Sequence, residues 1–252
     1  MIARTMFSGL RRIYSIPLLL VVWQVSVEFG WISSRLMPAP DIVLTAFWRD
    51  LTNGVLLNHA AVTMWRALSG FAAGAVFGIC LAAIMARYAL FARLFEPLIF
   101  LGYPIPKIAL FPIFMFTFGI GSSSKIAFTF FECFYPVVIT TYLGIRAMNV
   151  RLIWTARNFG ADHLTLFWRV LLPAALPSIF AGLRIALPLA ITVVVVTEMI
   201  GDSIGLGYYI SVWGTRFRFA NVYAGILMIG ICGLVLDWML TLLRNRLVKG
   251  NS

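Results

Sequence analysis

Residues 67–86, ALSGFAAGAVFGICLAAIMA, decide the class of fold, because they form a run of 20 residues without a charged side chain. The hydrocarbon core of a bilayer is about 30 Å thick, and a helix needs about 20 apolar residues to cross it. The whole chain has the same character, since 62% of its 252 residues are hydrophobic and 12% are charged. This composition predicts a polytopic membrane protein.

Similar apolar runs predict six transmembrane helices in a single membrane domain, residues 1–252. A closed β-barrel would need apolar and polar residues in alternation, and VVVV at 193–196 does not alternate. The fold class is therefore all-α and integral to the membrane. The helices are predicted at residues 13–30, 67–86, 95–118, 125–145, 178–200 and 219–243.

Basic side chains set the predicted orientation, because Lys and Arg near the ends of spans stay on the cytoplasmic side. With both termini in the cytoplasm, the inner side carries roughly twice as many basic residues as the outer side, and Lys107 falls within a span. The residues assigned to the inner side are Arg4, Arg11, Arg12, Arg87, Arg93, Arg146, Arg151, Arg157, Arg169, Arg184, Arg244, Arg246 and Lys249, and those assigned to the outer side are Arg35, Arg49, Arg66, Lys125, Arg216 and Arg218.

Several classes of function find no support in the sequence. This orientation explains most of the net charge of +11, so nucleic-acid binding is not predicted. The three cysteines lie within predicted spans without a C-x-x-C spacing, and the two histidines are far apart, so no disulfide or metal site is predicted. No catalytic motif is present, and GIGSSSK at 119–125 lacks the second glycine of a phosphate-binding loop. We therefore expect no enzyme activity and no cofactor in this chain.

Two sequence patterns predict helix packing, and each leaves open which surface the helix contacts. Between the first two spans, Leu44, Phe47, Trp48 and Leu51 recur at helical spacing, which fits a helix in the membrane interface or one packed on the bundle. In the second span, Gly70, Gly74 and Gly78 form a stripe that lets another helix approach closely. That helix belongs either to the same chain or to a second copy.

The third predicted span is a candidate for the lining of a transport pathway. Pro97, Pro104, Pro106 and Pro112 interrupt its hydrogen-bond ladder, and irregular backbone at membrane depth is tolerated only against protein or a wet cavity. Lys107 lies in its middle, where an unpaired charge is costly. This lysine either attracts an anionic solute or is neutralised by Glu132 or Glu96.

Glu132 and Glu198 are the other pathway or gate candidates, because a carboxylate within a span is functional or ion-paired by default. Asp237 is a further charge within a span. Glu198 precedes the glycine-rich stretch MIGDSIGLGY. It therefore belongs either to an external gate or to a turn whose amides it hydrogen-bonds.

The segment WTARNFGADHLTLFWRVLLP, residues 154–173, carries a motif of fixed spacing. It resembles the cytoplasmic loop of permease subunits of ATP-binding-cassette (ABC) importers, which reads Glu-Ala-Ala, three residues, Gly, nine residues, Ile-x-Leu-Pro. Stretches at 37–47, 104–127 and 197–210 extend the resemblance to the nitrate, sulfonate, taurine and bicarbonate branch of these permeases. The motif departs from the pattern at its start, where Trp154 and Thr155 replace Glu and the first Ala.

The resemblance implies a type I ABC importer-like permease with a core at residues 60–245 and an ATPase-coupling loop at 150–173. It implies an inner-membrane location and four kinds of partner: a pair of separate ATPase subunits that bind the ATP, a periplasmic solute-binding protein, a second permease copy and the lipid bilayer. Phe159, Leu164, Phe167 and Trp168 are predicted apolar anchors of the loop. The coupling residues carried over from the motif and its surroundings are Ala156, Phe159, Gly160, Ala161, Val170, Leu172 and Pro173.

We therefore predict a permease that forms the transmembrane pathway for a small anionic solute of the sulfonate, taurine, nitrate or bicarbonate class. The alternative is a self-sufficient secondary carrier or channel, which an inverted internal repeat would favour. A membrane scaffold or enzyme subunit is a third possibility, because helical bundles host many functions. Trp154 implies either an apolar pocket on the cognate ATPase or weaker coupling.

Overall fold

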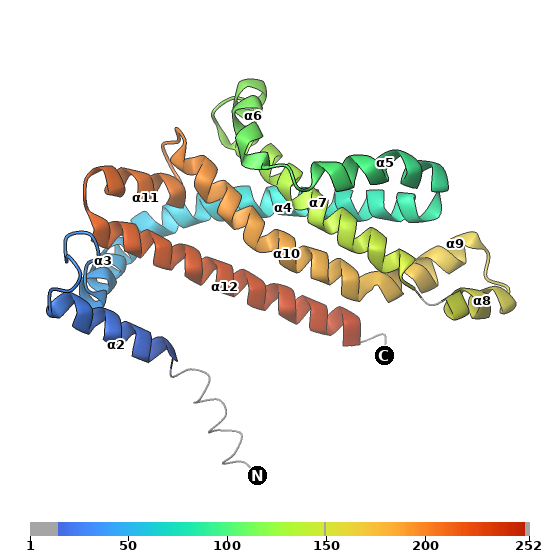
Figure 1. The fold of residues 1–252 in the computed structure, drawn as a ribbon, viewed down its shortest axis with the longest axis horizontal. Coiled ribbons are helices and arrows are strands. Elements are labelled where there is room, and N and C mark those ends of the chain that lie inside the picture. The colour runs from blue at the N-terminus through green and yellow to red at the C-terminus, as the bar shows by residue number, and fades with distance from the viewer. Residues whose placement is uncertain (1–14, 149, 250–252) are drawn as a thin grey trace, which may run out of the picture.

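The computed structural model describes residues 15–148 and 150–249, and every regular element within them is a helix. The helices form an elongated bundle (Figure 1). In chain order they are α2 (Ser15–Glu28), α3 (Pro40–Thr52), α4 (Val55–Arg87), α5 (Ala89–Gly102), η1 (Lys107–Leu110), α6 (Phe111–Phe118), α7 (Ser122–Arg146), α8 (Val150–Asn158), α9 (His163–Leu166), η2 (Phe167–Leu171), α10 (Leu172–Met199), α11 (Leu206–Thr215) and α12 (Phe219–Lys249).

The prediction of an all-α membrane protein is confirmed, and residues 15–148 and 150–249 contain four or five complete spans where six were predicted for the chain. In the described residues four stretches are long and apolar enough to cross a bilayer, namely α4, α7, residues 164–199 and α12, and α5 with η1–α6 makes a fifth if that bent pair counts as one span. The first predicted span, 13–30, corresponds to α2 in its described part. Fourteen helical residues reach only about 21 Å, less than the thickness of the hydrocarbon core.

The third predicted span is a helix pair rather than one kinked helix. Residues 89–102 and 107–118 meet at an angle of 96°. Pro104 and Pro106 lie in the break, where each lacks an amide donor and disfavours a helical residue before it. Pro97 lies inside α5 and Pro112 lies in the first turn of α6, so only two of the four prolines interrupt the helix.

The centre of the bundle is built from α4, α7 and α10. Its largest apolar cluster joins Ala67 of α4, Cys133 and Val137 of α7, and Ala186 and Val194 of α10. The glycine stripe of α4 faces α7: a Cβ on Gly70 would lie 2.5 Å from Thr129 Cβ, and one on Gly74 would lie 2.9 Å from Cys133 Cβ. The close approach that the stripe predicts is therefore within one chain.

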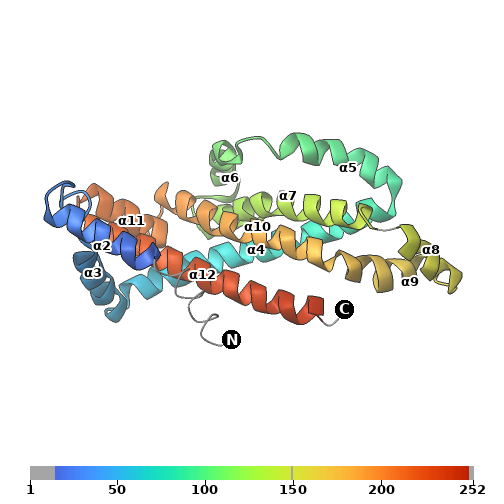
Figure 2. The same ribbon diagram turned by 60° about the horizontal axis from the view of Figure 1, so that its bottom comes forward.

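The bundle has two distinct ends, which both ribbon views separate (Figures 1 and 2). We call the end with α8 and α9 the coupling end and the end with α3 and α11 the distal end. The predicted helix between the first two spans is α3. It buries Val43, Ala46 and Asp50, packs Phe47 against the apolar cluster of α4 and α11 and exposes Leu44 and Trp48. Only part of the predicted apolar face therefore contacts the bundle.

Candidate functional sites

The coupling motif folds into two short helices joined by a tight turn at the coupling end. Gly160 has φ +78°, a left-handed conformation that glycine adopts without strain. Its amide donates to Arg157 O at 2.9 Å, and the Ala161 amide donates to Ala156 O at 3.0 Å. This pair of hydrogen bonds is the Schellman arrangement that ends a helix. The glycine of the motif is therefore the residue that stops α8.

Asp162 starts the second helix of the turn. Its Oδ1 accepts a hydrogen bond from the Thr165 amide at 3.0 Å, and its carbonyl accepts one from Leu166, as an N-cap residue does. The hydrogen bonds from Thr165 lower the pKa of the Asp162 carboxyl. Residues 160–162 thus stop one helix and begin the next, which gives the segment a defined bend.

The predicted apolar anchors divide into exposed and buried residues. Phe159 has 88% of its surface exposed, and Trp154, Leu164 and Trp168 are also exposed. Phe167 is buried, so the prediction that it offers a contact surface to a partner is wrong. Its ring packs edge-on against Trp168 at 5.4 Å between centroids, and it supports the exposed indole instead.

The second half of the motif leads into α10. Val170 lies in η2, a π-helical turn, and Leu172 and Pro173 follow it as the first residues of α10, within a helix that runs from residue 164 to residue 199. Val170 and Pro173 line a hollow of about 510 Å³ together with Leu152 of α8 and Val248 of α12. The motif therefore connects the exposed turn to two of the long helices.

Lys107 is a buried, paired residue. Its Nζ lies 3.5 Å from Glu132 Oε2 and donates to Tyr103 O at 3.1 Å. The ammonium also lies 5.0 Å from the centre of the Tyr135 ring. Lys107 and Glu132 are 8% and 12% exposed, so their charges neutralise each other away from water, and this geometry favours the structural interpretation of Lys107. Glu96, the other predicted partner, instead accepts a hydrogen bond from Tyr142.

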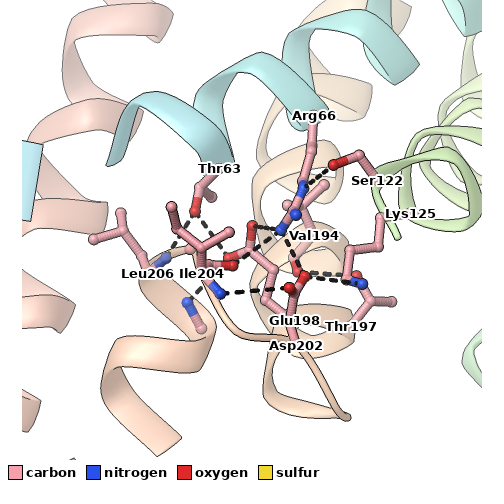
Figure 3. Close-up of polar contacts among 12 residues, drawn as sticks. Thr63, Arg66, Ser122, Lys125, Val194, Thr197, Glu198, Asp202, Ile204 and Leu206 are labelled. Carbon is pink, nitrogen blue, oxygen red and sulfur yellow. Dashed lines mark hydrogen bonds and ion pairs between the residues drawn. The ribbon is translucent and has the colours of Figure 1, made fainter. Parts of the chain in front are cut away.

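Glu198 lies at the centre of a buried polar network between the distal ends of α4, α7 and α10 (Figure 3). Its side chain is completely buried, and Oε1 lies 2.9 Å from Arg66 Nη1. Its Oε2 accepts hydrogen bonds from Thr63 Oγ1 at 2.8 Å and from the Gly207 amide at 3.1 Å. Glu198 thus bonds an amide at the start of α11, as one of its two predicted interpretations proposed.

Asp202 completes the network. Its Oδ2 lies 2.7 Å from Arg66 Nη1 and 2.9 Å from Lys125 Nζ. Two cations and two carboxylates therefore share one buried site, which is electrically neutral as a whole. Burial alone would raise the pKa of Asp202, but the hydrogen bond from Lys125 and the charges of Lys125 and Arg66 lower it.

The sequence prediction missed this network. It counted Arg66 and Lys125 as outer surface charges, whereas the two residues are 3% and 0% exposed. No short-range pattern reveals the pairing, since Arg66 and Glu198 are 132 residues apart. One signal was available in the sequence: Arg66 and Lys125 lie directly beside apolar runs, and a charge at membrane depth is costly unless an opposite charge lies next to it.

A second polar cluster lies at the distal end. Tyr209 of α11 and Asn221 of α12 both donate to Asp50 of α3, and Arg49 lies 2.8 Å from the same carboxylate. Burial would raise the pKa of Asp50, but the hydrogen bonds from Arg49, Tyr209 and Asn221 lower it. The cluster ties α3 to the ends of α11 and α12.

Arg184 lies within α10 and forms an ion pair with a carboxylate of α12. Its Nε lies 3.2 Å from Asp237 Oδ1 of α12, and the two side chains are 58% and 44% exposed. This pair accounts for Asp237, the remaining charge predicted within a span. It joins α10 to α12 on the side of the bundle.

The sequence and the fold both match known transport proteins. A family described as "Binding-protein-dependent transport system inner membrane component" matches residues 74–249. The putative aliphatic sulfonates transport permease protein SsuC of Escherichia coli (strain K12) is 36% identical over 190 residues, 75% of this chain and 72% of that protein. The taurine transport system permease protein TauC of the same strain is 30% identical over 238 residues, 92% of this chain and 86% of that protein.

The fold resembles a solved chain of the MetNI methionine ABC transporter in inward-facing conformations, with a TM-score of 0.62 and 17% identity over 73% of this chain and 94% of that chain. The family and its relatives do not favour a self-sufficient carrier or channel. Membership implies a multi-pass protein of the inner membrane that works with an ATPase and a solute-binding protein. The chain belongs to the family of binding-protein-dependent transport system inner membrane components and is an ABC importer permease.

Proposed function

We propose that the α8–α9 turn is the surface through which a separate ATPase drives this permease. The exposed Phe159 carries the proposal. Its side chain has 88% of its surface accessible to solvent, and burial of this apolar surface against a partner would stabilise the complex. Gly160 and Asp162 hold the turn in one shape, so that a push on Phe159 is transmitted to α10 through η2.

The coupling loop comprises residues 150–173, and Trp154 belongs to the same exposed surface. This indole stands where the family motif has a glutamate, so an apolar pocket on the cognate ATPase would accommodate it. Replacement of Trp154 by glutamate should weaken association with that ATPase. Unchanged association would argue against a co-adapted pocket.

The coupling proposal is tested with the complete transporter in proteoliposomes. Phe159→Ala should reduce solute-stimulated ATP hydrolysis and uptake together, while the bundle keeps its thermal stability. Phe217→Ala is the matched control, because Phe217 is 78% exposed at the distal end. Equal effects of the two substitutions, or normal coupling in Phe159→Ala, would contradict the proposal.

The proposed cargo is a small anionic solute of the sulfonate, taurine, nitrate or bicarbonate class. The named relatives transport aliphatic sulfonates and taurine, and this support does not involve Lys107, whose charge is already paired with Glu132. Uptake of sulfonates, nitrate, bicarbonate and a neutral heterocycle should be compared with all components present. Preferential uptake of the heterocycle would contradict the proposal.

The proposed assembly contains two copies of this permease, two ATPase subunits that hold the ATP, and a periplasmic binding protein. The core at residues 60–245 forms the pathway, and Lys107, Glu132 and Glu198 stabilise the helices around it. Both termini face the cytoplasm, which puts the coupling end on the ATPase side. Mass measurement of the purified complex tests the stoichiometry, and a single permease copy per two ATPases would contradict it.

A further inference from the structure

A basic hollow lies at the coupling end, where α4 ends, α5 begins and α7 ends. It has a volume of about 400 Å³. Its charged lining consists of Arg87, Arg93, Arg146 and Glu96, so three cations face one carboxylate. We call it the α4–α5 hollow. It is separate from the exposed α8–α9 turn and from the network around Glu198.

The positive charge of the α4–α5 hollow is only partly neutralised from within. Glu96 accepts a hydrogen bond from Tyr142 and lies 3.6 Å from Arg146. Among residues 15–148 and 150–249, no carboxylate forms an ion pair with Arg87 or Arg93. The guanidinium of Arg87 instead lies 5.0 Å from the centre of the Tyr88 ring, which leaves its donors available to an anion.

The start of α5 adds to this positive potential. Tyr88 precedes the helix without a side-chain cap, and the first turn has no acidic residue. Ala89 and Ala92 of that turn line the hollow. The unpaired amides and the dipole of a 14-residue helix therefore favour a negative group at this place.

A stripe of exposed leucines runs along α5, the helix that also carries Arg93 and Glu96 of the hollow. Leu90, Leu94, Leu98 and Leu101 are 75%, 57%, 61% and 74% exposed, and their spacing puts them on one face of the helix. Arg93 of the hollow is three residues from Leu90 and so borders this stripe. A basic site beside an exposed apolar face matches a molecule with an anionic head and hydrocarbon tails. A soluble anion would use only the hollow, and an acidic protein surface would not cover a leucine stripe at membrane depth.

We propose that the α4–α5 hollow binds the phosphate headgroup of an anionic phospholipid, whose acyl chains lie along the leucine stripe of α5. The lipid neutralises Arg87 and Arg93 and fixes the turn between α4 and α5. It is a structural ligand of the membrane protein and differs from the transported solute.

The test is a titration of the purified full-length chain with dioleoyl phosphatidylglycerol or dioleoyl phosphatidylcholine, followed by native mass spectrometry. Phosphatidylglycerol should bind with the higher affinity. Arg87→Gln with Arg93→Gln should lower that affinity roughly thirtyfold, since each basic residue near a lipid surface contributes about 1 kcal/mol. The single Arg93→Gln, at an exposed position, should lower it severalfold and guards against misfolding of the double variant.

The control is Arg244→Gln with Arg246→Gln, which removes the same charge from α12 toward the same end of the bundle (Figure 1). This variant should keep the affinity of the parent protein. Equal losses in both double variants would show diffuse attraction and overturn the proposal. The parent protein should also be titrated with inorganic phosphate alone. If phosphate binds with the same affinity as phosphatidylglycerol, and the Arg87→Gln with Arg93→Gln variant loses that binding, the hollow is a free-phosphate site and the lipid proposal is overturned. If the Arg87→Gln with Arg93→Gln variant binds phosphatidylglycerol as the parent does but no longer associates with the ATPase, the hollow is a contact site for a protein, which also overturns the proposal.

Discussion

Glu198 and Arg66 show how a buried charge depends on its partner. Both side chains are almost fully buried, and they meet at 2.9 Å. A buried ion pair contributes little net stability compared with an apolar pair of the same size, because both ions lose their hydration. Removal of one partner is far more destabilising, because the other then stays buried without compensation.

Glu198→Gln should therefore destabilise the protein by about 3–5 kcal/mol, since it leaves Arg66 and Lys125 with only one carboxylate. Chemical denaturation of the purified protein in a fixed detergent measures the change. Glu28→Gln is the control, because Glu28 is exposed and accepts a hydrogen bond from Gln24 at 2.7 Å. The loss of unfolding free energy in the double variant Arg66→Gln with Glu198→Gln should be smaller than the sum of the losses in the two single variants. Additive losses would contradict a direct pairing.

The lowered pKa of Asp202 predicts a sign for the pH dependence of stability. A carboxylate whose pKa is lower in the folded state stabilises the fold above its ordinary value of 3.8, and this contribution is lost as the pH falls through the folded pKa. The thermal unfolding temperature should therefore decrease when the pH is lowered below about 4. Asp202→Asn should flatten this decline and lower stability at pH 7. Asp41→Asn, at an exposed position, should leave the profile unchanged.

At the scale of elements, the contact between α4 and α7 depends on the absence of side chains. A Cβ on Gly74 would lie 2.9 Å from Phe130 O as well as from Cys133 Cβ, and a backbone oxygen cannot move without moving its helix. The small-residue stripe thus sets the separation of two central helices.

Gly74→Ala should destabilise the protein by about 1–3 kcal/mol, which is typical of an overpacked core. Gly230→Ala in α12 is the matched control, because a Cβ there meets nothing within 4 Å. It should be neutral or slightly stabilising, since alanine is the better helix former. Thermal unfolding of both variants in the same detergent gives the comparison. Equal stability of the two variants would refute the close packing.

The turn between α8 and α9 depends on the left-handed conformation of Gly160. Gly160→Ala should strain the turn by about 1–2 kcal/mol and speed hydrogen exchange across residues 150–166. Gly121→Ala is the control, because Gly121 has φ −70° and a Cβ added there would meet nothing within 4 Å. Exchange that stays the same in Gly160→Ala would mean that the turn tolerates a side chain.

For the molecule as a whole, the separation of the two ends leads to a prediction about sidedness. α8–α9 and the α11–α12 turn lie at opposite ends of the bundle (Figures 1 and 2). After replacement of the three native cysteines, Phe159→Cys and Phe217→Cys should react with a membrane-impermeant maleimide from opposite faces of the membrane, with Phe159→Cys labelled from the cytoplasm. Labelling of both from one face would contradict the arrangement.

The sequence predicted the helical class, most long helices and the coupling motif, because these depend on composition and on residues close together in the chain. It set the start of the second span at residue 67, after Arg66, whereas α4 begins at Val55. The charge of Arg66 ends the apolar run, but its carboxylate partners allow the buried helix to continue past it. Boundaries of this kind depend on residues far away in the chain.

The sequence by itself determined that the chain is a helical membrane protein and where the segment that resembles the cytoplasmic loop of ABC permeases lies, since hydropathy and local spacing are properties of neighbouring residues. Only the tertiary structure decided that Arg66, Lys125, Glu198 and Asp202 form one neutral buried site, that Glu132 rather than Glu96 pairs with Lys107, and that the interrupted third span is two helices at 96° to each other. The physical reason is that a charge in the membrane is stable only beside an opposite charge, and folding chooses that neighbour across more than a hundred residues for Arg66.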